Sequence, residues 1–447
     1  MKPITLREVA AACSGTLYGD PDIIITSIVT DSRKATAGSL FAAIKGERVD
    51  GHRFIPMTVA QGAVCVLCED IPSIDVPYIQ VESTLIALKG IAEYYRSLFT
   101  IPFIGVTGSV GKTSTKEFIG SVLSQKYNVH KTAGNFNNEL GVPLTLFGLE
   151  ENHEAAVIEM GISGFDEMTR LSKMVRPDIS VITNIGYCHL ENLGDRDGVL
   201  KAKTEMFTYL KNDGTIILCH DDDKLATVTD YKGIKPIFYG TDPADEYYAD
   251  EIEELLLDGV RCTLHHGDSA ITVTIPAMGR HNVLNALCAM AVGKQLGLTD
   301  DEIKRGIESF KNVGSRNNII HTRGMTVIDD CYNANPTSTK AGLNTLSNFS
   351  GRTVALLGDM KELGKEELTL HKEVGAYAKE KGIDLLIAVG TLSRSTAEGF
   401  GEGAVHFDTV DDCIASLGDL LREGDAVLVK ASHSMHFEKI TESLKEG

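Results

Sequence analysis

The strongest constraint on the fold is an alternation of apolar runs and amphipathic segments that begins near residue 100. IPFIGV, AAVIEM, ISVITNI and TIILCH are continuous apolar runs, and helical patterns such as KTSTKEFIGSVLSQKY and DEMTRLSKMV separate them. Strands that are apolar along their whole length are typical of a parallel sheet covered by helices on both faces. The same rhythm returns near residue 325 with MTVIDD, TVALLGD, DLLIAVG and AVLVKA. These patterns predict two α/β domains in succession.

The first part of the chain has a different pattern, with short strand-like stretches such as SLFAAI and AVCVLC between turns. A chain of 447 residues also exceeds what one ordinary core organises. We therefore predict an α/β protein of three domains. They are a small N-terminal α/β domain over residues 1–82, a central domain with a mostly parallel sheet over residues 83–313, and a C-terminal doubly wound, Rossmann-like domain over residues 314–447.

Composition limits the partners and the compartment. The formal net charge of −19 argues against nucleic acid or an anionic membrane surface as the main partner. The chain starts with MKPITLREVA, which lacks the apolar core of a signal peptide, and contains no apolar run long enough to span a bilayer. Nine cysteines lie scattered, several within apolar runs, as buried reduced thiols do. We expect a cytoplasmic protein without membrane insertion, acting as a monomer.

A phosphate-binding loop is the clearest functional motif. The segment IGVTGSVGKTSTKEF follows a buried strand and opens a helix, which is the context such a loop requires. Glycines let backbone N–H groups turn toward phosphate oxygens, and a lysine and a hydroxyl serve the outer phosphates and Mg²⁺. The spacing departs from GxxxxGK[ST], which would place glycine at Val106. The loop predicts a central P-loop domain that binds a nucleoside triphosphate such as ATP, and a coincidental glycine-rich turn is the alternative. The expected ATP contacts are Thr107, Gly108, Ser109, Val110, Gly111, Lys112 and Thr113.

Two polar residues follow later strands of the central domain. Glu159 ends the run AAVIE, and His189 comes after SVITNIGYC. Ligands bind beyond the carboxyl ends of parallel strands, so both residues are candidates for the nucleotide site. Glu159 can complete a Mg²⁺ shell with Thr113, since hard cations take oxygen ligands. Taken singly, a solvated strand end and a hydrogen-bonded turn histidine remain the alternative interpretations.

Two further groups of polar residues are ambiguous on pattern alone. Lys203 lies on a helix with an apolar side, and most helical lysines are solvated surface charges. The loop TAGNFNNELGVP carries Asn135, Asn137 and Asn138, which are amide donors and acceptors between a strand and a helix. Turn chemistry is the alternative for these asparagines.

Several segments together carry a resemblance to a known family. In chain order they are TGSVGKTS, TAGNFNNELGVP, VIEMG, TNIGYCHLENLG, KAKTEMF, GRHNVLNAL and DDCYNANPTS. With them, from about Thr30 to Lys430, the chain resembles the Mur ligase family of cell-wall peptide synthetases. The resemblance implies an ATP-dependent amide ligase that forms an acyl phosphate and releases ADP and phosphate. Within the family, EMG and YNANP imply that D-alanyl-D-alanine is joined to UDP-N-acetylmuramoyl-tripeptide in peptidoglycan precursor synthesis.

The resemblance also implies roles for individual residues. Lys203 is expected to be carbamylated by CO₂ and, with His189, to hold a second Mg²⁺, while Thr113 and Glu159 hold the first. The implied catalytic residues are Lys112, Lys203, His189 and Arg316. The further implied ATP contacts are Asn282, Arg316 and Asp330. The implied substrate contacts are Ser32, Arg33, Lys45, His52, Asn135, Asn137 and Asn138 for the UDP-sugar peptide and Tyr332, Asn333 and Asn335 for the incoming dipeptide.

One departure and two alternatives remain. His433 stands in VKASHSM, where the family tends to have arginine, and so a bidentate fork for carboxylate or phosphate is lost. A sister ligase with another amine donor, such as a folate-glutamate or diaminopimelate ligase, shares most of these motifs. A P-loop NTPase that switches a protein partner is an alternative of a different class.

Overall fold

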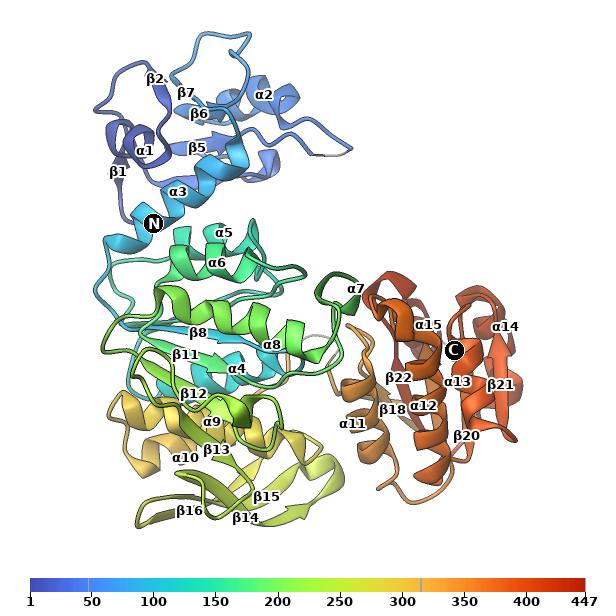
Figure 1. The fold of residues 1–447 in the computed structure, drawn as a ribbon. Helices are drawn as coiled ribbons and strands as arrows, with labels where there is room; N and C mark the ends of the chain where they lie inside the picture. The colour runs from blue at the N-terminus through green and yellow to red at the C-terminus, as the bar shows by residue number, and fades with distance from the viewer. Residues whose placement is uncertain (47, 314–315, 447) are drawn as a thin grey trace.

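The fold is mixed α/β, and each of its three domains has a main sheet of its own, as Figure 1 shows. The computed structural model describes residues 1–46, 48–313 and 316–446. The blue N-terminal domain lies above the central domain, and the orange and red C-terminal domain lies beside it. This confirms the predicted three-domain α/β architecture. The boundaries at 82/83 and 313/314 stay predictions, and residues 314 and 447 themselves lie outside the described residues.

The N-terminal domain contains a five-stranded sheet in its described residues, in the order β2-β7-β6-β5-β4. Among the described strands of this sheet only β2 and β7 pair antiparallel, and helices α1 and α2 accompany the sheet. Strands β1 and β3 form a separate antiparallel pair. Both cysteines of the Cys65-to-Cys68 segment are buried in β6, as the strand-like pattern predicts. The elements are β1 (Ile4–Thr5), α1 (Leu6–Cys13), β2 (Thr16–Tyr18), β3 (Ile24–Ile25), β4 (Ser27–Val29), β5 (Ser39–Ala42), α2 (Ile55–Ala60), β6 (Cys65–Cys68) and β7 (Tyr78–Gln80).

The central domain is built on a nine-stranded sheet, counted over the described residues, in the order β16-β15-β14-β13-β12-β11-β8-β10-β9. Along this order, all neighbouring strands from β14 to β9, with β8 among them, pair in parallel. The β14–β15 and β15–β16 pairs are antiparallel. The strands are β8 (Phe103–Thr107), β9 (Val129–Lys131), β10 (Ala155–Glu159), β11 (Ile179–Ile182), β12 (Thr215–Cys219), β13 (Ile237–Gly240), β14 (Tyr247–Glu254), β15 (Val260–His266) and β16 (Ser269–Ile275). The helices are α3 (Thr84–Ser97), α4 (Lys112–Leu123), α5 (Gly141–Phe147), α6 (Glu167–Val175), α7 (Leu190–Leu193), α8 (Arg196–Thr204), α9 (His281–Gln295) and α10 (Asp300–Glu308).

The position of β8 in this sheet determines where a ligand binds. Its neighbours β10 and β11 lie on opposite sides of it, so the strand order reverses direction there. In an open α/β sheet a crevice opens at such a reversal, beyond the carboxyl ends of the strands. The segments that leave β8, β10 and β11 therefore share one crevice, and the phosphate loop is the first of them.

The C-terminal domain is a doubly wound sheet, as predicted. In the described residues its strand order is β17-β18-β22-β19-β20-β21, and all neighbours except β17 and β18 pair in parallel. The strands are β17 (Asn318–Thr322), β18 (Met325–Asp329), β19 (Thr353–Gly358), β20 (Leu385–Val389), β21 (Ala404–Phe407) and β22 (Ala426–Lys430). The helices are α11 (Pro336–Leu346), α12 (Glu367–Glu380), α13 (Ser393–Phe400), α14 (Val410–Leu420) and α15 (Glu438–Glu446).

No helix in the described parts of the chain is both long and apolar enough to cross a bilayer.

Candidate active site

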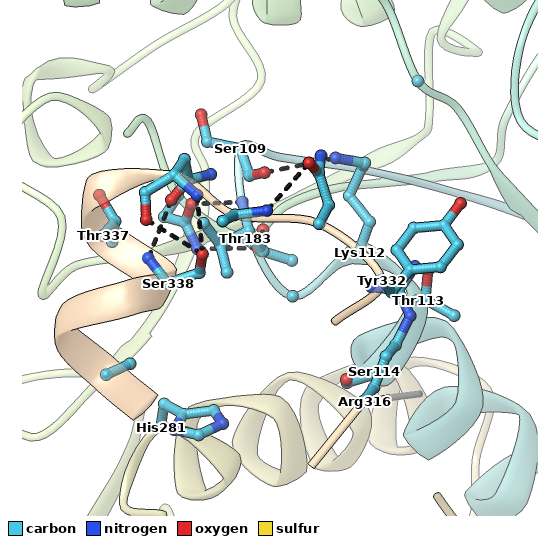
Figure 2. Close-up of a pocket in the computed structure, with 18 of the residues that line it drawn as sticks. Ser109, Lys112, Thr113, Ser114, Thr183, His281, Arg316, Tyr332, Thr337 and Ser338 are labelled. Carbon is cyan, nitrogen blue, oxygen red and sulfur yellow. Dashed lines mark hydrogen bonds between the residues drawn. The ribbon is translucent and has the colours of Figure 1, made fainter. Parts of the chain in front are cut away.

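A cavity of about 530 Å³ lies where the central domain faces the C-terminal domain. The phosphate loop, the end of β11 and helix α9 line it from the central domain. Residues between Arg316 and Lys430 line it from the C-terminal domain. Figure 2 shows Thr337 and Ser338 on α11 facing the loop around Ser109. The two domains therefore build one site together.

The conformation of the phosphate loop explains its glycines. Gly111 has a φ of 83°, in the left-handed region that glycine adopts easily. Gly108 has a φ of 148°, and a Cβ added there would lie 1.9 Å from Thr183 Oγ1. The residues after β11 brace the loop, because the Val110 N–H donates to Asn184 Oδ1 at 2.9 Å. The loop is thus held open at the amino end of α4, where unpaired helical N–H groups attract anions.

Lys112 folds back onto this loop and donates from Nζ to the carbonyl oxygen of Gly108 at 2.8 Å. Burial lowers the pKa of the Lys112 ammonium, with the Glu159 charge acting in the opposite direction. A phosphate in the loop would offer this ammonium a charged partner in place of a carbonyl. The side chain is therefore within reach of any phosphate that the loop holds.

Glu159 is fully buried at the end of β10, so its interpretation as a solvated strand end is wrong. The Thr113 hydroxyl donates to Glu159 Oε2 at 2.9 Å, and the Asn137 amide donates to Oε1 at 2.8 Å. Lys116 Nζ lies 3.7 Å from Oε2 and donates to the Thr132 carbonyl at 2.7 Å. A hydroxyl and a buried carboxylate in contact are the oxygen ligands that Mg²⁺ takes. The residues present fit the first predicted metal site.

His189 also lines the cavity, at the start of α7 and with a φ of 53°. Its Nδ1 lies 2.5 Å from Glu362 Oε2 of the C-terminal domain. The two atoms are in close contact without the alignment of a hydrogen bond, and they form an ion pair when the imidazole carries a proton. No sequence pattern around Glu362 predicts this contact.

Lys203 is buried on α8, which rules out the surface lysine that its helix suggested. Burial lowers the pKa of its ammonium to about 8. Within the described residues Nζ forms no hydrogen bond or ion pair. A buried lysine without a counter-charge is unusual, because a charged group removed from water is costly unless it is paired. Lys203 does not itself line the cavity, although the Lys112 charge acts on it.

Of the remaining predicted nucleotide residues, Arg316 and Asp330 line the cavity and Asn282 does not. The Arg316 guanidinium lies 4.0 Å from the centre of the Tyr332 ring, and Figure 2 shows the pair beside Lys112. Asp330 pairs with buried Lys430, with 2.5 Å between Oδ2 and Nζ. Asn282 is buried and donates to the Met278 carbonyl rather than lining the cavity.

The residues predicted to meet the dipeptide come together, since Tyr332, Asn333 and Asn335 all line the cavity. Asn335 is the N-cap of α11, where its side-chain oxygen accepts from the Ser338 N–H at 2.8 Å. Its side-chain nitrogen makes no hydrogen bond within the described residues. Tyr332 and Asn333 precede the helix. The Asn333 side-chain oxygen accepts from the Ala334 N–H at 2.9 Å, and the Tyr332 ring lies against Arg316 and His433.

In the asparagine loop, only two of the three predicted residues line this cavity. Asn137 holds Glu159, as described above. Asn138 precedes α5, and its side-chain oxygen accepts from the Gly141 N–H at 2.8 Å. Asn135 is exposed and does not line the cavity.

A second hollow lies in the N-terminal domain, and Ser32 and Arg33 contribute to its wall. Arg33 forms a bidentate pair with Asp31, at 2.9 and 2.8 Å. Lys45 and His52 do not line this hollow. Lys45 pairs with Asp70 at 2.9 Å, and the His52 ring lies between Asp50 Oδ1 at 2.7 Å and a backbone N–H at 3.0 Å. Both side chains therefore have partners within the N-terminal domain, and their role in substrate binding stays a prediction.

Sequence reasoning missed residues that support the site from behind. Thr183 and Asn184 brace the phosphate loop, and Asn285 accepts from the Thr115 hydroxyl at 2.8 Å. Lys116 is completely buried beside Glu159. The signal for Lys116 was its position one helical turn after Thr113, which places both side chains on one face of α4.

Models of known families match the chain in three consecutive segments. The Mur ligase family catalytic domain matches residues 24–98, and the Mur ligase middle domain matches residues 106–293. The Mur ligase glutamate ligase domain matches residues 315–433.

Full-length relatives and solved structures agree with these matches. The chain is 37% identical to the UDP-N-acetylmuramoyl-tripeptide–D-alanyl-D-alanine ligase of Bacillus subtilis, covering 99% of this chain and 98% of the relative. Its Escherichia coli counterpart is 35% identical over 100% and 99% of the two chains. A crystal structure of MurF from Acinetobacter baumannii superposes with a TM-score of 0.94, at 33% identity and full coverage of both chains. MurF from Thermotoga maritima in complex with ADP has a TM-score of 0.84, at 29% identity over 94% and 97% of the chains.

Proposed function

The chain belongs to the Mur ligase family, and we propose that it is the ATP-dependent ligase that joins D-alanyl-D-alanine to UDP-N-acetylmuramoyl-tripeptide. The relatives that carry this activity in their names match it over nearly their whole length. The observation that carries the proposal is the shared cavity. Lys112 of the phosphate loop and Tyr332 and Asn333 of the C-terminal domain line the same space. ATP and UDP-linked substrates are found in the cytoplasm, where we expect the enzyme.

The reaction has two steps that this cavity can accommodate. The terminal carboxylate of the tripeptide attacks the γ-phosphorus of ATP, which forms an acyl phosphate and releases ADP. The amine of the dipeptide then attacks the acyl carbon and loses a proton as the amide forms. The single bond between the acyl carbon and the phosphate oxygen breaks, and phosphate leaves with its electrons. Lys112, the amino end of α4 and Arg316 stabilise the negative charge on the transferring group. No side-chain nucleophile is required.

The Thr113 and Glu159 side chains fit one magnesium ion, and we propose a second ion beside it; both ions would neutralise phosphate charge when bound. Thr113 and Glu159 would hold one ion, since both side chains already meet at 2.9 Å. His189 and a carbamylated Lys203 would hold the other. The Lys203 ammonium first loses a proton, and the neutral amine then joins CO₂ and releases a second proton. A buried cation without a partner thus becomes an anion. The burial of Lys203 supports this role.

The two substrates would enter from different domains. We assign the hollow beside Ser32 and Arg33 to the uridine nucleotide and the C-terminal side of the cavity to the dipeptide. Asn333 and the free amide of Asn335 offer polar groups to a short peptide. Lys45 and His52 are engaged with acidic and backbone partners, so we give them a supporting place in the N-terminal domain.

The test is a phosphate-release assay in which UDP-linked tripeptide is crossed with D-alanyl-D-alanine, D-glutamate and diaminopimelate. We expect phosphate release only when ATP, the tripeptide and D-alanyl-D-alanine are all present. Phosphate release with another amine would show that the chain is a sister ligase with that amine donor. Slow ATP hydrolysis that ignores both carboxylate and amine would indicate an NTPase switch.

A further inference from the structure

A short loop of the C-terminal domain lies directly against the turn that carries His189. We call residues 361–364 the docking loop. Glu362 Oε2 of this loop lies 2.5 Å from His189 Nδ1. Two residues further on, a Cβ added to Gly364 would lie 3.2 Å from the Glu191 backbone nitrogen. Figure 1 shows α7, which starts after His189, at the side of the central domain that faces the C-terminal domain. Two independent contacts therefore join the loop to this turn.

The docking loop is a built feature with a constrained backbone. Glu362 has a φ of 65° and Gly364 a φ of 62°, while His189 opposite has a φ of 53°. Non-glycine residues adopt this left-handed region rarely, and strained positions persist where the surroundings hold them, often at functional sites. The loop is anchored at both sides of Glu362. Leu363 is buried in the core, and the Met360 N–H donates to His371 Nε2 at 2.9 Å.

The contact is better suited to orienting His189 than to stabilising the fold. The Glu362 side chain is 57% exposed, and ion pairs with that exposure contribute little to stability. A carboxylate at Nδ1 restricts the ring and leaves Nε2 as the nitrogen available for a ligand. Histidines that bind metals commonly have such a partner on the other nitrogen.

We propose that Glu362 is a positioning residue for His189, and that the docking loop makes the second Mg²⁺ site depend on the arrangement of the C-terminal domain. The inference rests on the proposed function, in which His189 holds that ion. When the C-terminal domain moves away, Glu362 and Gly364 move with it. His189 then loses the partner that orients its ring, and the turn at Glu191 loses its packing. The second metal site is complete only when the domains are docked.

The first test pushes the loop away sterically. Gly364→Ala adds a methyl group against the Glu191 backbone, whereas Gly382→Ala places one in open space at a similar φ of 73°. Both variants carry the same kind of backbone penalty, so their difference reports the contact between domains. In the metal-free and nucleotide-free protein we expect amide hydrogen exchange of residues 189–193 to rise at least about fivefold in Gly364→Ala only. Equal exchange in the two variants would overturn the proposal.

The second test removes the negative charge of Glu362. Glu362→Gln is compared with Glu366→Gln, which removes an exposed carboxylate from the same domain without touching His189. Loss of a metal ligand's partner lowers metal affinity by about 10-fold or more. We expect Glu362→Gln to weaken Mn²⁺ binding to the nucleotide complex, followed by electron paramagnetic resonance, and to raise the Mg²⁺ concentration for half-maximal turnover by a similar factor. The KM for D-alanyl-D-alanine should stay unchanged.

His189→Ala separates the failure of this inference from the failure of the proposed function. If His189→Ala binds the wild-type number of Mn²⁺ ions with wild-type affinity, the assignment of His189 as a ligand is wrong. If His189→Ala weakens Mn²⁺ binding but Glu362→Gln and Gly364→Ala do not, only the positioning role is wrong.

Discussion

At the scale of single residues, the site depends on charges that are buried within a few ångströms of one another. Lys116 Nζ lies 3.7 Å from Glu159 Oε2 and 3.1 Å from Glu117 Oε1, and both carboxylates are almost completely enclosed. Removing one partner of a buried pair leaves an uncompensated charge and costs about 3 kcal/mol or more, whereas an exposed pair is worth about 1 kcal/mol or less. We therefore expect Lys116→Met to destabilise the central domain by about 3 kcal/mol.

The measurement is urea denaturation followed by circular dichroism. Lys131→Met is the matched control, because Lys131 also pairs with Glu117 but its side chain is 43% exposed. The control should lose about 1 kcal/mol or less. An equal loss of unfolding free energy in the two variants would mean that burial does not strengthen the Lys116 contact.

Lys203 leads to a prediction about activity rather than stability. Lys203→Ala should lose at least about 100-fold in kcat, because the second Mg²⁺ loses its anionic ligand. Short carboxylates added to the buffer should restore part of the rate by occupying the vacated volume. Removing CO₂ from a solution of the wild-type enzyme should lower its kcat as well, and adding bicarbonate should restore it. Ligation at the wild-type rate by Lys203→Ala would eliminate the carbamate.

At the scale of elements, the turn after β8 and the segment after β11 are built to fit each other. Gly108 combines a φ of 148° with a Thr183 Oγ1 only 1.9 Å from where a Cβ would lie. Overpacking of this kind costs about 1–3 kcal/mol and moves the backbone. We expect Gly108→Ala to lower the thermal unfolding midpoint and to weaken ATP binding at least about 10-fold by calorimetry. Gly233→Ala, at a φ of 88° and with open space around it, should leave ATP binding unchanged.

At the scale of the whole molecule, our proposal divides the substrates among the domains. Asn333 lines the cavity from the C-terminal domain, and Arg33 lines the hollow of the N-terminal domain. Asn333→Ala should raise the KM for D-alanyl-D-alanine by about 10-fold with little change for ATP, as expected for a lost hydrogen bond. Arg33→Ala should act on the KM of the UDP-linked substrate instead. The measurement is steady-state kinetics with each substrate varied in turn. An equal change in the KM values for ATP, the UDP-linked substrate and D-alanyl-D-alanine in either variant would contradict this division.

Much of this architecture was open to prediction because its signals are local. Apolar runs and amphipathic helices follow from the periodicity of neighbouring residues, and the glycines and lysine of the phosphate loop lie within a few positions of Lys112. The order of the motifs along the chain was enough to recognise the family. The domain boundaries and the monomeric state stay predictions, since linkers without a change of composition leave no local mark.

What the sequence by itself determined is therefore the element types, the three-domain organisation and the nucleotide loop. Only the tertiary structure decided which polar side chains are buried and what they meet. Lys203 has the sequence pattern of a surface lysine but is enclosed, and Lys45 is engaged with acidic neighbours outside the hollow wall. Glu362 meets His189 across a domain interface. Contacts of this kind join residues far apart in the chain, and their free energy depends on burial and distance rather than on sequence spacing.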